Sequence, residues 1–234
     1  MRKIDRTCVL MTLMLVASAA MLWAAVTPYS QDFEGLLQTD PAALGNDGWL
    51  VFGNVFESDG TTYVYGYGPN PAPNGGPPYA FCTIASGEGG PAQGAQQLTV
   101  FSDYNNADHG IGRIIESNVF QEQTIEAGDV GAVVAFSFDA KMGDLVAPST
   151  ALAFIKTLDP AAGFATTNFI TIDMTNIPAT WDTYSIQLPI DAGLVGQILQ
   201  FGFSNRATNY NPSGVFYDNI NQPVPVELMS LSVE

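Results

Sequence analysis

Hydrophobic and polar residues alternate along much of the chain with a period of two. In the segment VGAVVAFSFDAK, residues 130–141, Val134, Phe136, Phe138 and Ala140 fall on one side of an extended strand, and the residues between them fall on the other. The same analysis predicts further strands at 49–56, 62–67, 97–101, 111–117, 151–157, 169–172, 181–188, 198–205 and 215–220. No long stretch has helical periodicity.

Turn-forming sequences separate these strands, and they complete the prediction of the fold. NDG at 46–48, SDG at 58–60, DPAAG at 159–163 and NPSG at 211–214 all favour turns. Many short strands at this spacing predict an all-β protein, an antiparallel β-sandwich of the jelly-roll type.

One such domain is expected over residues 26–222. Residues 66–94 hold 8 glycines and 6 prolines and predict a long surface loop, either functional or mobile. Residues 223–234 are expected to be a tail, either a linker or an extra edge strand.

The first 25 residues have the layout of a secretory signal peptide. Three basic residues lie within the first six, an apolar run covers 8–23, and two alanines precede the expected cleavage site. The alternative is an uncleaved N-terminal anchor. We expect a secreted protein, extracellular or at the cell surface of a bacterium, with no membrane contact after cleavage.

The chain is strongly acidic, with 23 acidic residues against 7 basic ones. The leader holds three of the basic residues and one acidic residue, so the mature chain carries a formal net charge of about −18. Such a charge excludes nucleic acid and anionic membranes as good partners, because their phosphates need Lys and Arg. It suits an exterior that contains calcium, although solubility alone also accounts for most of the acids.

Cysteine content excludes an internal disulfide in the mature protein. Cys8 leaves with the leader, and Cys82 then stands alone. Stability must come from a hydrophobic core, a metal ion or both. The mature length is ample for one core.

Four short pieces recur in a recognisable order. They are QDFEG at 31–35, FSFDAK at 136–141, TWDTYSIQL at 180–188 and GVFYDNI at 214–220. Together they resemble the galactose-binding-like jelly rolls, particularly secreted bacterial carbohydrate-binding modules, over nearly the whole mature chain. The resemblance implies non-catalytic recognition of a polysaccharide.

The resemblance also implies a structural calcium ion. In that family an acidic residue after the first strand and an Asp in the last strand help to hold it, and the matching positions here are Glu34 and Asp218. Carboxylates are ordinary Ca²⁺ ligands. Alternatively, Glu34 is a solvated edge residue and Asp218 satisfies a turn. SDYNNADHG, residues 102–110, lacks the spacing of a calcium loop and is expected to be an Asx-rich turn.

Aromatic residues supply the candidate sugar-binding surface. Tyr63, Tyr65 and Tyr67 alternate, so on a regular strand they share one face. The Gly/Pro-rich segment that follows contains Tyr79. Aromatic rings stack on the apolar faces of pyranoses, and Trp49 is a further candidate. The alternative for each tyrosine is ordinary packing at the core boundary, and Trp181 is expected in the core.

An enzyme is the second hypothesis, because jelly rolls also host glycoside hydrolases and polysaccharide lyases. The candidate cluster lies in residues 108–123 and comprises His109, Arg113, Glu116 and Glu122. A lyase would use a base beside an Arg that neutralises a uronate. Arg113 is also a candidate ligand contact in a binding module. A lone histidine in a turn, however, is expected to be a polar surface residue.

A structural surface or matrix protein is the third hypothesis. The acidic surface disfavours strongly anionic glycans unless Arg113, Lys141 and Lys156 cluster. A binder should present ordered aromatic rings on an open face, whereas an enzyme should bring two or three titratable groups together in one cleft. The sequence leaves the oligomeric state open.

Overall fold

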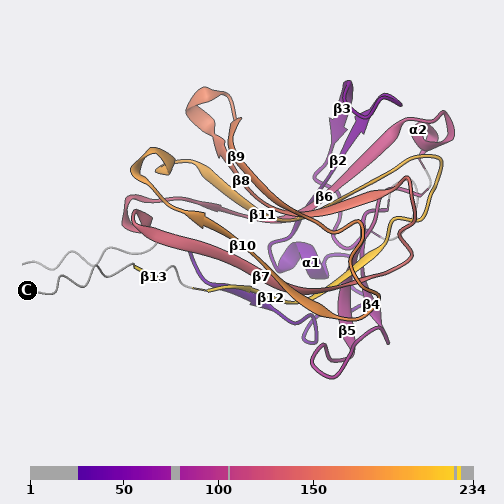
Figure 1. Ribbon diagram of the computed structural model, residues 1–234, viewed down its shortest axis with the longest axis horizontal. Coiled ribbons are helices and arrows are strands. Elements are labelled where there is room, and N and C mark those ends of the chain that lie inside the picture. The colour runs from indigo at the N-terminus through magenta and orange to yellow at the C-terminus, as the bar shows by residue number, and fades with distance from the viewer. Residues whose placement is uncertain (1–25, 75–79, 105, 224–225, 228–234) are drawn as a thin grey trace, which may run out of the picture.

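Two antiparallel β-sheets face each other and form a sandwich, which confirms the predicted fold class (Figure 1). The computed structural model describes residues 26–74, 80–104, 106–223 and 226–227. Sheet A has seven strands in the order β10 (Asp182–Pro189), β7 (Ala132–Met142), β12 (Val215–Gln222), β5 (Gln96–Val100) and β4 (Cys82–Ser86), with β1 (Tyr29–Gln31) beside β12 and β13 (Val226–Glu227) beside β7.

Sheet B has six strands and lies across the core from sheet A. Its order is β3 (Tyr63–Tyr67), β2 (Leu50–Phe56), β6 (Ile114–Thr124), β11 (Ile198–Ala207), β8 (Thr150–Asp159) and β9 (Ala165–Asp173). The helical elements are single turns: α1 (Ala43–Asn46), α2 (Ala107–Gly110), η1 (Ala127–Asp129), η2 (Pro160–Ala162) and η3 (Ala192–Leu194). Among the described helices, none has the length and apolar character needed to cross a bilayer.

Aromatic side chains fill the space between the sheets. Phe136 and Phe138 of β7 lie on its core face as the alternation predicted, and both are buried. Phe203 of sheet B stacks on Tyr217 of sheet A with ring centroids 3.6 Å apart. Burying one such ring contributes roughly 2 to 3 kcal/mol, so this layer holds the two sheets together.

The segment 66–94 is not one loop, because it contains β4. Its residues Cys82 and Ile84 point into the core and alternate with Thr83 and Ala85. The glycines and prolines on both sides of this short strand concealed it. The tail expected at 223–234 contributes β13 to sheet A, and residues 228–234 lie outside the described part of the chain.

The loop between β4 and β5 lies over the outer face of sheet A. The Lys141 ammonium donates to the Glu88 carbonyl at 2.6 Å and pairs with the Glu88 carboxylate at 2.8 Å. The Trp181 indole N–H donates to the same carbonyl at 3.0 Å. Trp181 is therefore half-buried beneath this loop, on the outside of the sandwich, and its expected place in the core is wrong.

Candidate functional site

The outer face of sheet B carries a groove of about 320 Å³, which we call the sheet B groove. The β2–β3 and β8–β9 hairpins at the two edges of the sheet rise on either side of the central strands, away from sheet A (Figure 1). The groove is lined by Leu50, Phe52, Asn54, Asn118, Phe120, Glu122, Lys156, Leu158 and Gln200.

Aromatic rings from four strands run across this face. Successive ring centroids are 6.0 Å apart for Phe52 and Phe120, 6.4 Å for Phe120 and Phe154, and 5.9 Å for Phe154 and Phe169. Phe120 and Phe154 are buried and form the floor, whereas Phe52 is half-buried and Phe169 is 55% exposed. The two outer rings are therefore the ones that a ligand can touch.

A glycine allows the two floor rings to approach each other. Gly202 of β11 lies in register with Phe120 on one side and Phe154 on the other. A Cβ atom at Gly202 would lie 2.3 Å from the Val119 carbonyl oxygen and 2.8 Å from the Phe120 Cβ. Any side chain here would displace the floor of the groove.

Polar groups lie beside the rings in a row across three strands. Gln200 is in register with Glu122 on one side and with Lys156 on the other. Its Nε2 donates to the Glu122 Oε2 at 2.7 Å. The Lys156 ammonium lies 5.3 Å from the Phe154 centroid and 5.9 Å from the Phe120 centroid, and burial lowers the pKa of this ammonium although Glu116 and Glu122 oppose the shift.

A second polar group is organised around Glu116. Its Oε1 accepts from the Asn54 Nδ2 at 3.0 Å and from the Asn118 Nδ2 at 3.2 Å, and its Oε2 pairs with the Arg206 guanidinium at 2.8 Å. The guanidinium lies over the ring of Phe56 at 4.4 Å. Glu116 thus fixes the two amides at the groove. The whole face offers apolar rings beside hydrogen-bond donors and acceptors, a combination that suits a hydroxylated ring compound.

The carboxylates of this face do not form a glycosidase pair. Glu116 and Glu122 lie on the same side of β6 but six residues apart, which corresponds to about 20 Å along a strand. Glycoside hydrolases hold their two carboxylates about 5 to 10 Å apart.

The three alternating tyrosines do not share a face. The pairing of β3 with β2 shifts between Tyr65, which lies opposite Val55, and Tyr63, which lies opposite Phe56, so Val64 is an inserted residue. Tyr63 is 59% exposed and its ring contacts Phe56 on the outer face of sheet B. The prediction of one common face is wrong because this bulge reverses the alternation.

Tyr65 and Tyr67 remain together, and the structure brings Arg113 near them. Their rings are 5.9 Å apart, and the Tyr65 hydroxyl donates to the Asp108 carboxylate. Arg113 pairs with Asp108 at 2.8 Å and with Glu57 at 2.9 Å. Two carboxylates therefore already hold the guanidinium.

These tyrosines border a second hollow at one end of the sandwich. Its volume is about 380 Å³, and Pro69, Asn70 and Asn106 complete much of its wall. Tyr65 is partly exposed there. Burial, followed by its bond to Asp108, raises the pKa of Tyr65 to about 12, so its hydroxyl stays protonated at neutral pH.

Trp49 is a core residue, and its prediction as a stacking residue is wrong. It is 2% exposed, and its ring packs against Phe203, Tyr29 and Phe33 between the sheets. Its position immediately before β2 points the indole inward. Tyr79, another predicted contact, lies outside the described residues.

His109 is buried, contrary to the expectation of a polar surface residue. Its Nδ1 accepts from the Tyr210 N–H at 3.1 Å, and its Nε2 lies 3.4 Å from the Ser102 Oγ. Burial lowers the pKa of His109 to about 4, so the ring is neutral. With Arg113 ion-paired and the two glutamates on sheet B, the residues at 108–123 do not share one cleft.

The predicted calcium ligands, Glu34 and Asp218, lie near the paired chain ends. The Glu34 Oε1 accepts the N–H groups of Ala95 and Gln96 at 2.7 Å each. Asp218 is fully buried, and its Oδ1 accepts the Asn219 N–H at 2.6 Å while its Oδ2 has no hydrogen-bond partner. Burial, with the negative charges of Glu34, Asp139 and Asp32, raises the pKa of Asp218 to about 7.

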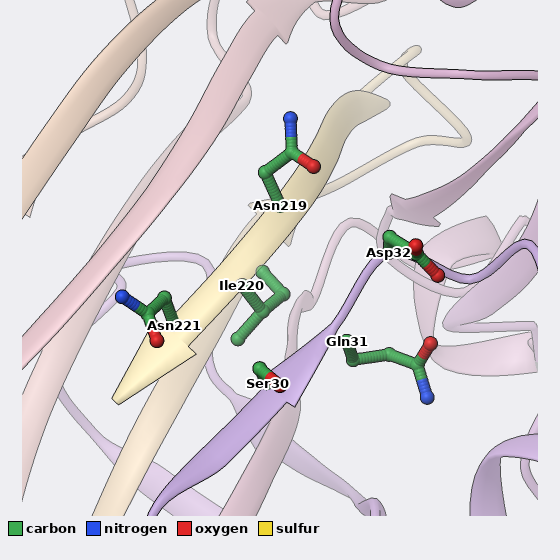
Figure 2. Close-up of a pocket in the computed structure, with 6 residues that line it drawn as sticks. All are labelled: Ser30, Gln31, Asp32, Asn219, Ile220 and Asn221. Atoms are coloured by element: carbon green, nitrogen blue, oxygen red, sulfur yellow. The ribbon is translucent and has the colours of Figure 1, made fainter. Parts of the chain in front are cut away.

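A polar hollow of about 370 Å³ lies between β1 and β12, next to Asp218 in the chain. Figure 2 shows Gln31 and Asp32 on the β1 side and Asn219 and Asn221 on the β12 side. Carboxylate and amide oxygens, which these side chains carry, are the donors that Ca²⁺ prefers. Within the part of the chain that the structure describes, however, no three carboxylate, histidine or cysteine side chains are close enough to hold a metal ion.

The groove residues that sequence reasoning missed left one signal. Phe52, Phe120 and Phe154 are aromatic residues on the outward side of strands whose inward side is already apolar. Lys156 and Gln200 gave no signal of their own, because only strand pairing places them side by side.

No protein-family model and no curated protein matches the chain. Solved structures that are similar in fold include the C-terminal family 22 carbohydrate-binding module of Clostridium thermocellum Xyn10B (13% identity, 86% of this chain and 96% of that chain, TM-score 0.43). Another is the tandem of two such modules from Paenibacillus barcinonensis Xyn10C (13% identity, 88% of this chain and 47% of that one, TM-score 0.44).

A third is the enzymatically active domain of bacteriophage CBA120 tailspike protein 4 (16% identity, 62% of this chain, TM-score 0.40), of which the chain spans only 18%. The chain likewise spans 26% of a C. thermocellum xylanase fragment that carries a family 22 module beside its catalytic module.

Proposed function

We propose that the protein is a non-catalytic carbohydrate-binding module and that the sheet B groove receives a polysaccharide. One observation carries the proposal: the half-buried ring of Phe52 and the exposed ring of Phe169 lie on the same face as a polar row in which Gln200 stands in register between Glu122 and Lys156. Sugars need this combination, because their C–H faces stack on aromatic rings while their hydroxyls both donate and accept hydrogen bonds.

The groove favours a neutral or weakly charged chain over a polyanion. The negative charges of Glu116 and Glu122 act on Lys156, the mature chain is strongly acidic, and Arg206 is paired with Glu116. The four basic side chains of the mature protein therefore do not combine into one cationic site.

The test is binding of the mature protein, residues 26–234, to soluble xylan, mixed-linkage β-glucan, galactan and a polyuronate, with each glycan monitored for cleavage. The informative variant is Phe52→Ala, and the matched control is Phe164→Ala, since Phe164 is exposed on the β8–β9 turn. We expect Phe52→Ala to weaken binding about tenfold or more, which corresponds to at least about 1.4 kcal/mol, and the control to bind normally.

Other outcomes point to different accounts. Loss of binding in Tyr65→Ala with retention in Phe52→Ala would move the site to the hollow at the end of the sandwich. Cleavage products would indicate an enzyme. If the protein neither binds nor cleaves any glycan of the panel, the result would favour a structural surface protein.

We further propose a structural calcium ion at Asp218, with Glu34 and Asp32 as the neighbouring carboxylates. The support is the buried, unpartnered Asp218 Oδ2 beside other negative charges. Backbone carbonyls or water would supply the remaining oxygens. Millimolar calcium should raise the melting temperature of the wild type and leave Asp218→Asn unchanged. An equal rise in both proteins, or none in either, would refute this site.

Secretion is the last part of the proposal and rests on the sequence of the first 25 residues. N-terminal sequencing of protein recovered outside the producing cells tests it. A start near Val26 is expected, and a retained leader would favour a membrane anchor.

A further inference from the structure

The outer face of sheet A carries a hollow of about 520 Å³, which we call the sheet A hollow. Thr99 of β5 lies in register with Phe216 of β12, and Phe216 lies in register with Lys141 of β7. These side chains point away from the core, because residues beside them in the sequence, such as Leu98 and Tyr217, are buried between the sheets. The hollow therefore opens on the opposite side of the sandwich from the sheet B groove.

Aromatic rings form part of the wall of this hollow. Phe101 and Tyr104 stack with ring centroids 5.2 Å apart, and Phe216 lies on the adjacent strand. Tyr104 and Phe216 are half-buried, so part of each ring remains open to a ligand. The Lys141 ammonium lies 5.2 Å from the Phe216 centroid and pairs with the carboxylate of Glu88, which borders the hollow.

Polar groups lie beside these rings. Thr99 is only 9% exposed, and among the described residues its Oγ1 has no hydrogen-bond partner. The Asp144 Oδ1 accepts the Gly214 N–H at 2.8 Å, and the Tyr104 hydroxyl accepts the Ser213 N–H at 2.9 Å. These bonds hold the carboxylate and the phenol in place on the wall. An unpaired buried hydroxyl costs free energy, which a ligand hydroxyl bonded to Thr99 would recover.

We propose that the sheet A hollow is a second glycan-binding site and that it receives a neutral sugar residue. Sugar C–H faces stack on aromatic rings, and sugar hydroxyls can bond both to Thr99 and to Asp144. An anionic ligand is disfavoured by the charge of Asp144, because Lys141 is already paired with Glu88. A purely apolar ligand would leave the Thr99 hydroxyl unpaired.

Two sites on opposite faces would make a single chain bivalent. One molecule could then hold two polysaccharide chains at once and cross-link them. This consequence rests on the proposed function of the sheet B groove, whereas the sheet A hollow is argued from its own residues.

The test is titration calorimetry of the mature protein with short oligosaccharides of xylan, mixed-linkage β-glucan and galactan. The informative variant is Thr99→Val, which keeps a branched strand residue and removes the hydroxyl. The matched control is Thr83→Val, since Thr83 lies in register with Thr99 on β4 and does not line the hollow. We expect two bound oligosaccharides per chain for the wild type and the control. Thr99→Val should weaken one site roughly three- to tenfold without lowering the melting temperature.

A second variant tests the aromatic wall. Phe216→Leu keeps an apolar side chain and removes the ring, so it should abolish binding at the hollow, while Phe52→Ala should abolish only the other site. In Phe52→Ala, added oligosaccharide should still shift the NMR signals of the Gly143 and Gly214 amides, which border the hollow. The wild type should raise the viscosity of a soluble polysaccharide, and neither single variant should do so.

The possible failures of the two proposed sites can be told apart. A single bound oligosaccharide that is lost in Phe52→Ala and retained in Phe216→Leu would overturn the sheet A hollow and leave the proposed function intact. The reverse pattern would keep the hollow and refute the sheet B groove. Equal effects of Thr99→Val and Thr83→Val would overturn the role of the Thr99 hydroxyl. No binding of any of these oligosaccharides would overturn both sites.

Discussion

Gln200 donates a hydrogen bond from its amide to the carboxylate of Glu122, its neighbour across the strand pair, at 2.7 Å. The amide is buried, and its Oε1 has no hydrogen-bond partner among the described residues, although β8 carries Lys156 in register with Gln200. The polar row of the groove therefore places a carboxylate, an amide with an unpartnered oxygen and an ammonium next to one another.

Lys156→Met should separate binding from stability. The methionine keeps an apolar stem over Phe120 and Phe154 but removes the half-buried ammonium. We expect glycan affinity to fall about tenfold through the loss of a charged donor, while the melting temperature stays equal or rises. Calorimetric titration and thermal unfolding measure the two effects. A fall in stability with unchanged affinity would make Lys156 a purely structural residue.

Trp49→Ala should destabilise the fold by about 3 to 5 kcal/mol, because it empties a large volume between the sheets. The folded fraction should still bind glycan, since the indole does not reach the sheet B groove. Denaturant unfolding gives the first quantity. Phe52→Ala is the opposite case, with affinity lost and stability largely kept. If Trp49→Ala instead lost affinity and kept its stability, while Phe52→Ala lost stability and kept its affinity, Trp49 would be the residue that stacks on the sugar.

Asp218 should make stability depend on pH in calcium-free buffer. Its pKa is raised in the folded state to about 7 from an unfolded value of 3.8, so the folded protein holds the proton more tightly. The contribution is fully present below the unfolded pKa and is lost as the pH rises to about 7, by at most roughly 4 kcal/mol.

Asp218→Asn should remove this dependence, because the amide stays neutral. Melting temperatures from about pH 4 to about pH 8 with chelator present measure the effect. A wild type whose stability is flat or rises over that range, once other groups are corrected for with the variant, would contradict the raised pKa.

His109 should act in the opposite direction on acidification. Its pKa is depressed to about 4 from 6.5, so the neutral ring stabilises the fold above about pH 6.5, and this contribution is lost as the pH falls toward 4. His109→Gln should flatten the acid limb of a stability–pH curve. An unchanged acid limb would show that the ring is not buried as a neutral group.

Gly202→Ala should damage the groove through its floor. The added Cβ would meet the Val119 carbonyl oxygen and the backbone of Phe120, so β6 or β11 must shift. We expect a loss of about 1 to 3 kcal/mol of stability together with weaker glycan binding. Gly131→Ala, at a loop position with no neighbour near its Cβ, tests whether loss of a glycine alone produces the effect, although its positive φ adds some strain.

Local patterning predicted most of the fold. The core face of β7 could be predicted residue by residue, because a strand that is buried on one face alternates apolar and polar residues along its sequence. β4 was not predicted, because its five residues between Gly/Pro-rich flanks are too few to show a clear alternation of apolar and polar residues. His109 was misjudged because its burial depends on Tyr210, about a hundred residues away in the sequence.

The candidate site was less predictable for a related physical reason. Lys156, Gln200 and Glu122 become neighbours only through the order of strands in sheet B, and no local rule encodes that order. Tyr65, Tyr67 and Arg113 were singled out for their chemistry, and the structure does bring them together. The prediction of one common tyrosine face was wrong at Tyr63, because an alternating sequence gives no sign of a single inserted residue.

Because Val64 is an inserted residue, the side chains before it and after it in β3 do not follow one alternation. The insertion gives the two ends of this short strand different surfaces, because Tyr63 lies on the outer face of sheet B while Tyr65 and Tyr67 border the hollow at the end of the sandwich. Deleting Val64 would leave Tyr63 opposite Phe56 and Tyr65 opposite Val55, so each ring would keep its face. A register change that flattened the bulge at constant length would instead bring the three rings onto one face, and the aromatic surface at this edge of the sheet would change without the replacement of any aromatic residue.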